Sequence, residues 1–160
     1  MDIYRTLDTI PLLPESVLTI GTFDGCHRGH QEIIKKVYSL AQFNNTTSVL
    51  ITFDPHPRHI LESGDKLPLL MHINKKLEIL ESLHLDVVLV IPFNEEFSHI
   101  KAADFLQNIV VRHFKPTCII VGYDHHFGFK REGSPEFLNN FGKKNNISVD
   151  IVAPIADENV

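Results

Sequence analysis

The stretch that most constrains the fold of this chain is residues 17–30, followed directly by an amphipathic segment. Residues 17–20 are apolar or β-branched and are bounded by Gly21, which predicts a short buried strand. Residues 31–43 carry apolar side chains at helical spacing, which predicts a helix. A strand, a glycine turn and a helix N-terminus in succession form a natural phosphate site, because free backbone N–H groups and the helix dipole both favour an anion there.

Two histidines, His27 and His30, lie in this turn, and their spacing of three places them on one face of the first helical turn. Each alone would suit a capping or packing role. The pair, flanked by Gly29 and preceded by two glycines that permit a tight turn, Gly21 and Gly25, favours binding instead. We therefore predict that both imidazoles are catalytic: they donate hydrogen bonds to a polyphosphate and stabilise the charge that develops when a phosphate bond breaks.

The rest of the chain alternates apolar strands with amphipathic helices. We expect strands at residues 48–53, 86–91, 117–121 and 147–152, and helices at residues 74–83, 101–114 and 135–145. Asn74 is the expected N-cap of its helix. Residues 1–16 and 93–98 are expected to lack regular structure. This alternation predicts an α/β fold, a Rossmann-like three-layer sandwich with a mostly parallel five-stranded sheet.

A proline-flanked histidine follows the predicted strand at residues 48–53, in the sequence Asp54-Pro55-His56-Pro57. The two prolines prevent continuation of the strand and predict a stiff loop. The carboxyl ends of strands are where open α/β sheets bind ligands, so we expect this loop to border a site. An exposed turn residue is the alternative interpretation of His56.

A loop rich in glycine, aromatic and basic residues follows the predicted strand at residues 117–121. Gly122 would let the backbone approach a base, Asp124 would accept a hydrogen bond from a ribose hydroxyl or adenine, and Arg131 would face phosphate. The aromatic residues would shield a flat ring system. We therefore predict a nucleotide-binding loop.

Two alternatives apply to the same loop. A metal site at His125 and His126 is disfavoured, because adjacent histidines rarely bind one metal together and no thiolate lies near. A plain surface loop is the other alternative.

Composition restricts the class of function. The chain has 160 residues, 43% of them hydrophobic, which suits one domain with its own core. A net charge of −5 with mixed signs predicts no nucleic-acid partner, and no apolar run approaches the length of a membrane span. Cys26 and Cys118 form no paired motif, and Cys118 lies in an apolar run that predicts a core thiol; this usage indicates a reducing, cytoplasmic setting.

The sequence Gly-Thr-Phe-Asp-Gly-Cys-His-Arg-Gly-His at residues 21–30 resembles the His-x-Gly-His signature of the nucleotidyltransferase superfamily. Thr-Phe-Asp-Pro-His-Pro at residues 52–57 makes the chain look most like the adenylyltransferase domain of prokaryotic FAD synthetases, the bifunctional riboflavin kinase/FMN adenylyltransferases. His125 stands where an aromatic residue is common in that family. The later loop matches the family pattern at Gly122, Asp124, Phe127, Gly128, Arg131 and Gly133.

The resemblance implies that the phosphate of FMN attacks the α-phosphorus of ATP in line, giving FAD and pyrophosphate without a protein nucleophile. Mg²⁺ would assist and be held mainly by substrate oxygens, with Asp24 and Asp54 as possible metal, hydrogen-bonding or turn-capping groups. The expected ATP-binding residues are Gly21, Phe23, Asp24, Gly29, Gly122, Asp124 and Arg131. The expected flavin-binding residues are Phe53, Pro55, His56 and Phe127.

Family members carry a further Ser/Thr-rich motif after the fifth strand and a riboflavin kinase domain, and neither occurs in these 160 residues. We therefore expect a single nucleotidyltransferase domain with weakened ATP affinity, and a riboflavin kinase domain as its partner in a full-length protein. Two alternatives stay open: another adenylyl- or cytidylyltransferase of the superfamily, and a non-catalytic flavin- or nucleotide-binding module. The Asp-Pro-His-Pro loop and the aromatic later loop disfavour the first, whereas the missing motif keeps the second open.

Overall fold

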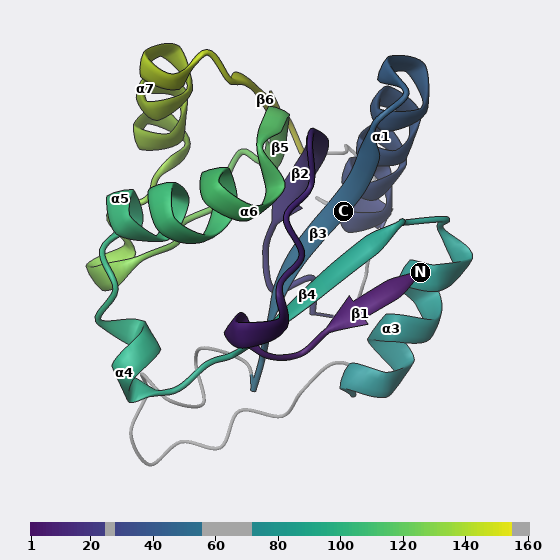
Figure 1. Ribbon diagram of the computed structural model, residues 1–160, viewed down its shortest axis with the longest axis horizontal. Helices are drawn as coiled ribbons and strands as arrows, with labels where there is room; N and C mark the ends of the chain where they lie inside the picture. The colour runs from purple at the N-terminus through teal and green to yellow at the C-terminus, as the bar shows by residue number, and fades with distance from the viewer. Residues whose placement is uncertain (25–27, 56–71, 155–160) are drawn as a thin grey trace.

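The computed structural model of the protein describes residues 1–24, 28–55 and 72–154. Within these residues the strands form one six-stranded sheet in the order β1-β4-β3-β2-β5-β6 (Figure 1). All neighbouring strands in it are parallel. The strands are β1 (Asp2–Tyr4), β2 (Ser16–Ile20), β3 (Thr47–Asp54), β4 (Val87–Pro92), β5 (Pro116–Gly122) and β6 (Ser148–Val152).

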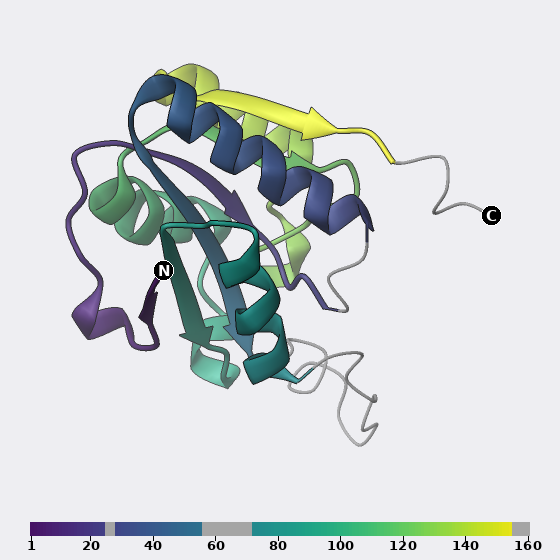
Figure 2. The same cartoon turned by 90° about the vertical axis from the view of Figure 1, so that its right-hand side faces the viewer.

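Helices cover both faces of the sheet and complete three layers (Figures 1 and 2). One face carries α1 (Arg28–Asn44) and α3 (Ile73–Ser82). The opposite face carries α5 (Ala102–Phe105), the π-helix η2 (Leu106–Val111), α6 (Arg112–Phe114) and α7 (Pro135–Asn145). The predicted α/β, Rossmann-like three-layer fold is confirmed. No helix of the described residues is long and apolar enough to cross a membrane.

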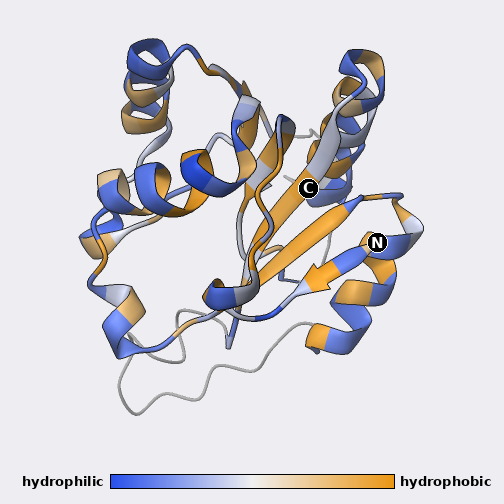
Figure 3. Ribbon diagram, in the orientation of Figure 1, coloured by the Kyte–Doolittle hydropathy of each residue, from blue (hydrophilic) through white to orange (hydrophobic). Residues whose placement is uncertain are grey.

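The core consists of two apolar layers, one on each face of the sheet. Alternate residues of one strand enter different layers: Val49 and Ile51 of β3 pack under α5 and α6, whereas Leu50 packs under α1 and α3. The central strands therefore carry apolar residues toward both faces, as is typical of parallel strands buried on both sides. Figure 3 shows hydrophobic colour in the middle of β3 and along β4. Cys118 lies in the α1 layer as a buried free thiol, as predicted.

Strand β2 occupies the position that determines where a ligand can bind. It pairs with β3 on one side and with β5 on the other, and all five of its residues are buried. The chain runs from β2 to β3 and β4 on one side, then crosses to β5 and β6 on the other. Connections leave β2 and β5 in opposite directions, so a crevice opens between their carboxyl ends.

The sheet has one strand more than the sequence predicts. Residues 2–4, expected to be irregular, form β1 and pair with residues 87–89 of β4. The Asp2 N–H also donates to the Asp86 carbonyl at 2.9 Å. Three residues are too few to show the two-residue periodicity of a strand, so this edge strand is stabilised by backbone pairing that no local pattern reveals. A short 3₁₀ helix, η1 (Leu7–Thr9), follows in the same stretch.

Four predicted details of the helices need correction. The N-cap of α3 is His72, not Asn74: its Nδ1 accepts from the Asn74 N–H at 3.2 Å. Residues 93–98, expected to be a loop, contain α4 (Glu95–Ser98), which Asn94 caps by accepting from the Phe97 N–H at 2.7 Å. The predicted helix at residues 101–114 is not continuous, because η2 interrupts the α-helical hydrogen bonding in its middle. Helix α1 begins three residues earlier than predicted, at Arg28.

Gly142 in α7 provides a test of how α7 packs on β6. A Cβ at this position would lie 2.5 Å from the Ile147 carbonyl oxygen and 2.8 Å from Val149 Cγ2. Gly→Ala normally favours a helix by about 1 kcal/mol, but we expect Gly142→Ala to destabilise the protein by about 1–3 kcal/mol through overpacking. Urea denaturation measures the change. Asn140→Ala, at an exposed position of the same helix, is the control and should shift stability by less than about 0.5 kcal/mol; equal effects would contradict this packing.

Candidate functional site

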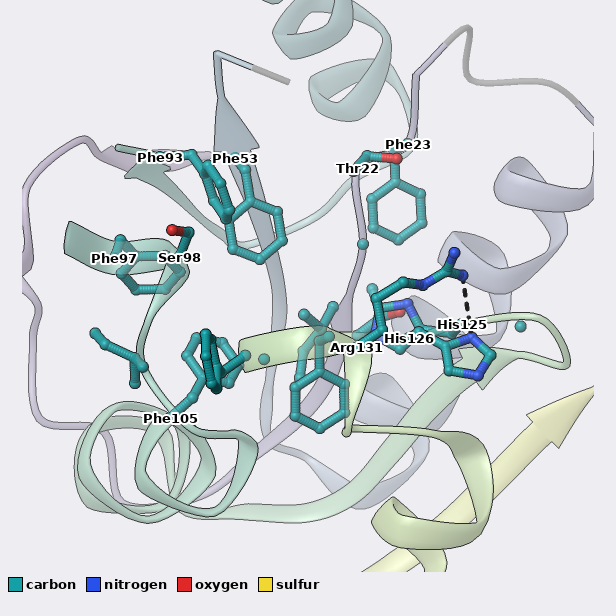
Figure 4. A pocket seen from close by; sticks show the side chains of 18 of the residues that line it. Thr22, Phe23, Phe53, Phe93, Phe97, Ser98, Phe105, His125, His126 and Arg131 are labelled. Carbon is teal, nitrogen blue, oxygen red and sulfur yellow. Dashed lines mark hydrogen bonds between the residues drawn. The ribbon is translucent and has the colours of Figure 1, made fainter. Parts of the chain in front are cut away.

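A cavity of about 580 Å³ lies at the carboxyl ends of the central strands, at the crevice beside β2. Its wall takes residues from the ends of β2, β3 and β5, from the first turns of α1, and from the segments around α4 and after β5 (Figure 4). It brings together eight of the thirteen residues predicted for the site. These are Gly21, Phe23, His30, Phe53, Gly122, Asp124, Phe127 and Arg131.

Five predicted site residues are not in this wall. Asp24, Gly29 and Pro55 are described by the structure but do not line the cavity. His27 and His56 lie outside the described residues, as does Gly25 of the predicted turn. The roles predicted for these residues stay predictions.

The turn after β2 forms one side of the cavity. The Gly21 N–H donates to the Ile51 carbonyl at 3.0 Å, which continues the pairing with β3 past the strand end. Phe23 then adopts a left-handed conformation with φ of 51°, which is unusual for a bulky residue and concentrates at functional sites. Its buried ring meets the His30 ring edge-on, with centroids 5.3 Å apart. A Cβ at Gly21 would lie 3.0 Å from that phenylalanine ring, so a larger residue here would push against it.

A group of phenylalanines forms the opposite end of the cavity (Figure 4). The aromatic wall, as we call it, consists of Phe53, Phe93, Phe97, Phe105 and Phe127. Each ring contacts at least one other with centroids between 5.6 and 6.0 Å apart, mostly edge-on or tilted. Such a wall gives a broad apolar surface for a flat ligand.

Sequence reasoning missed Phe93 and Phe97 because residues 93–98 were expected to be loop. The signal was present: Asn94 is a good N-cap, and it would have placed a helix turn there. That turn brings the Phe93 and Phe97 rings to within 5.6 Å of each other.

The segment after β5 is attached tightly to the body of the protein. Phe127 and Gly133 exchange backbone hydrogen bonds of 3.1 and 2.8 Å, and the Phe129 N–H donates to the Ile100 carbonyl at 2.9 Å. Glu132 Oε1 accepts from the Ala102 N–H at 2.6 Å, so its carboxylate satisfies an N–H at the start of α5. Gly128 is required because its φ is 80° and a Cβ would lie 2.8 Å from Ala102.

Basic side chains of this segment face the cavity at its other end. An Arg131 guanidinium nitrogen lies 3.4 Å from His126 Nδ1 (Figure 4). The same Nδ1 atom of His126 lies 3.1 Å from the Asp124 carbonyl oxygen. Arg131 and Lys130 both have left-handed backbones, with φ of 57° and 53°. The cavity therefore has a cationic end that suits phosphate and an aromatic end that suits a ring.

His125 stands at the position where an aromatic residue is common in the family that the sequence resembles. Its ring stacks on Phe127, with centroids 5.5 Å apart and planes 24° apart, so it supplies flat contact all the same. Burial, with a smaller effect of His126, lowers the pKa of His125 to about 4, and Asp124 opposes the shift. Its Nε2 is buried and has no hydrogen-bond partner within the described residues. The imidazole is therefore neutral at physiological pH.

The lowered pKa of His125 predicts acid sensitivity. The unfolded chain binds a proton near the ordinary pKa of 6.5, whereas the folded chain resists protonation until about 4. Above the pKa of the unfolded chain, His125 is neutral in both states and does not lower the free energy of unfolding. As the pH falls toward the pKa of the folded chain, the unfolded state gains a proton that the folded state does not. The free energy of unfolding should therefore decline by about 1–2 kcal/mol between about pH 7.5 and pH 5.

His125→Phe keeps the stacked ring and removes the titrating group, so urea denaturation across this pH range should show a flatter stability profile. His84→Asn is the control, because His84 is exposed and asparagine tolerates its φ of 67°. A His125→Phe profile as steep as that of the wild type would contradict the burial of this imidazole.

Comparison with known proteins shows which family this chain resembles. A family model described as FAD synthetase matches residues 10–160. The bifunctional riboflavin kinase/FMN adenylyltransferase of Buchnera aphidicola subsp. Schizaphis graminum is 35% identical over 144 residues, which are 90% of this chain and 46% of that protein. The protein of the same name from Escherichia coli strain K12 is 31% identical over 145 residues, 89% of this chain and 46% of that protein.

A macrolide-efflux protein from Streptococcus pneumoniae has the same fold, with a TM-score of 0.83 at 23% identity, over 99% of this chain and 52% of that one. The chain spans about half the length of the curated relatives it matches. The family model covers nearly all of the sequence, from Ile10 to Val160. This chain belongs to the FAD synthetase family.

Proposed function

We propose that this chain is an FMN adenylyltransferase, which transfers AMP from ATP to FMN and releases FAD and pyrophosphate. The observation that carries the proposal is a single cavity with two chemically different ends. One end joins a helix N-terminus to histidine and arginine side chains, and the other is a wall of phenylalanines. These are the surfaces that a nucleoside triphosphate beside a flavin ring needs. Relatives named riboflavin kinase/FMN adenylyltransferase support the same assignment.

ATP belongs at the end formed by β2, α1 and β5 in this proposal. His30 in the first turn of α1 faces the cavity, where the helix dipole also favours phosphate. Gly122 and Asp124 at the end of β5 would contact the nucleoside, and Arg131 would contact phosphate. His27, Asp24 and Gly29 would complete this end, as the sequence predicts.

FMN belongs against the aromatic wall. Phe53 and Phe127, predicted from sequence, lie there together with Phe93 and Phe97. A tricyclic ring stacked on these side chains would lose its hydration on that face and gain van der Waals contact. Pro55 and His56 would border the same ring from the loop after β3.

Catalysis would consist of positioning and charge stabilisation. An oxygen of the FMN phosphate forms a new bond to the α-phosphorus, while the bond from that phosphorus to the bridging oxygen breaks and pyrophosphate leaves with the electron pair. His30, with His27, would donate hydrogen bonds to the phosphate oxygens as charge accumulates on them. Mg²⁺ would shield the phosphate charge when bound; its preference for hard oxygen ligands fits the substrate phosphates, which would hold most of it.

Two other candidate acceptors within the nucleotidyltransferase superfamily, pantetheine phosphate and an alcohol phosphate, would fit this cavity less well. Pantetheine phosphate or an alcohol phosphate offers no flat ring to the five phenylalanines of the aromatic wall. A riboflavin kinase domain would be the partner of this chain in a longer protein, which agrees with the half-length coverage of the relatives.

Turnover tests the proposal directly. The chain is incubated with Mg²⁺, ATP and FMN, and FAD and pyrophosphate are quantified. We expect both products in equal amounts, and we expect His30→Ala to lower kcat by about 100- to 1,000-fold while FMN affinity stays within about threefold. Lys35→Ala, at an exposed site on the same helix, should retain activity. Binding of both ligands without product would indicate a binding module, and product only with another phosphate acceptor would indicate a sister enzyme.

The aromatic wall predicts a different signature for Phe97. Phe97→Ala removes a ring that contacts Phe53, Phe93 and Phe105. We expect FMN affinity, measured by quenching of flavin fluorescence, to fall by about tenfold or more because apolar contact is lost, with ATP affinity nearly unchanged. Phe43→Ala removes a ring that is 87% exposed and should alter neither. An equal loss of ATP and FMN affinity in Phe97→Ala would contradict this placement.

A further inference from the structure

Lys76 is a charged residue inside the protein. It lies in the first turn of α3 and is 6% exposed, whereas its neighbour Lys75 has 65% of its side chain exposed and pairs with Glu78. Lysine is almost never buried to this degree, because an ammonium loses strong hydration on leaving water. A protein tolerates a buried ammonium where polar groups of the protein accept hydrogen bonds from it.

The contacts of Lys76 reach the two strand ends that border the cavity. Its Nζ donates to the Thr22 carbonyl at 2.6 Å and to Thr52 Oγ1 at 3.3 Å. The Thr52 hydroxyl in turn donates to the same Thr22 carbonyl at 3.0 Å. A triangle of hydrogen bonds therefore joins α3, the end of β3 and the turn after β2.

The shared acceptor is the carbonyl of the peptide that leads into Phe23. This is the residue with the left-handed backbone, φ of 51°, and both Thr22 and Phe23 line the cavity. A peptide unit is planar and places its N–H opposite its carbonyl, so fixing the Thr22 oxygen toward Lys76 also fixes the direction of the Phe23 N–H. A charge-assisted hydrogen bond is the stronger kind, and an unfavourable backbone conformation persists only where its surroundings enforce it.

We propose that Lys76 is a positioning residue for the polyphosphate-binding turn. Its ammonium, through the Thr22 carbonyl and the Thr52 hydroxyl, holds residues 21–23 in the conformation that receives the phosphates of ATP. This inference rests on the proposed function, since it takes ATP as the ligand of the turn.

Lys76→Met tests the inference, because methionine fills similar space without the charge or the donor. We expect the Kd and KM of ATP to rise by at least tenfold, with kcat within about threefold and FMN affinity within about twofold. Isothermal titration with ATP and quenching of FMN fluorescence measure the two affinities separately. Lys75→Met, at the exposed neighbouring lysine, is the matched control and should leave both affinities at the wild-type level.

A second variant covers the case in which Lys76→Met does not fold. Thr52→Val keeps the shape of a side chain that is fully buried and removes one corner of the triangle, so it should weaken ATP binding by about three- to tenfold and leave FMN binding unchanged. A purely structural role for Lys76 would instead lower thermal stability and weaken both ligands alike, and that result overturns the inference.

The binding and turnover measurements distinguish the two proposals. Suppose that the wild-type protein makes FAD and that ATP affinity is unchanged in Lys76→Met or, if that variant is unfolded, in Thr52→Val. This result would overturn the role of Lys76 and leave the proposed function standing. Wild-type protein that binds ATP and FMN but makes no FAD would overturn the proposed function, while a selective loss of ATP affinity in the variants would still support Lys76. Failure of the wild type to bind ATP would overturn both.

Discussion

The parallel pairing of β2 between β3 and β5 is the constraint on which the site depends. Parallel strands end at the same edge of a sheet, so segments that follow strands far apart in sequence meet there. Residues near position 22, position 53 and position 124 thereby come to line one cavity. The histidines and phenylalanines of the site come from different segments of the chain. The order of the strands places these segments together, so that one cavity has a cationic end and an aromatic end.

Strand pairing brings the segments after β2, β3 and β5 together, but contacts outside the sheet determine the conformations of these segments. Glu132 attaches the segment after β5 to the start of α5, and Gly128 packs closely on Ala102. Lys76 attaches the turn after β2 to β3 and α3. The buried ammonium of Lys76 and the left-handed backbone of Phe23 both cost free energy where they are. Such costs collect at functional sites because the surrounding structure sustains them.

The sequence predicted the parts of the fold that have strong local signals. The buried strands with apolar runs and the amphipathic helices were confirmed, since periodicity reflects which face is buried. Edge strand β1, the His72 cap and the π-helix were missed because each depends on partners distant in sequence or on hydrogen bonding that side-chain pattern does not encode. Phe93 and Phe97 were missed for a different reason: a four-residue helix has too few residues for periodicity, although its N-cap was present.

A crystal structure of this chain with FAD bound would test the central claim most directly, since FAD joins both halves of the proposed site in one molecule. We expect the adenosine to lie at the ends of β2 and β5, beside Gly122 and Asp124, and the flavin ring to lie against Phe53, Phe93 and Phe97. The pyrophosphate bridge would then pass the turn that contains Phe23 and the first turn of α1. A flavin ring bound away from the aromatic wall, or an adenosine outside the cavity, would contradict it.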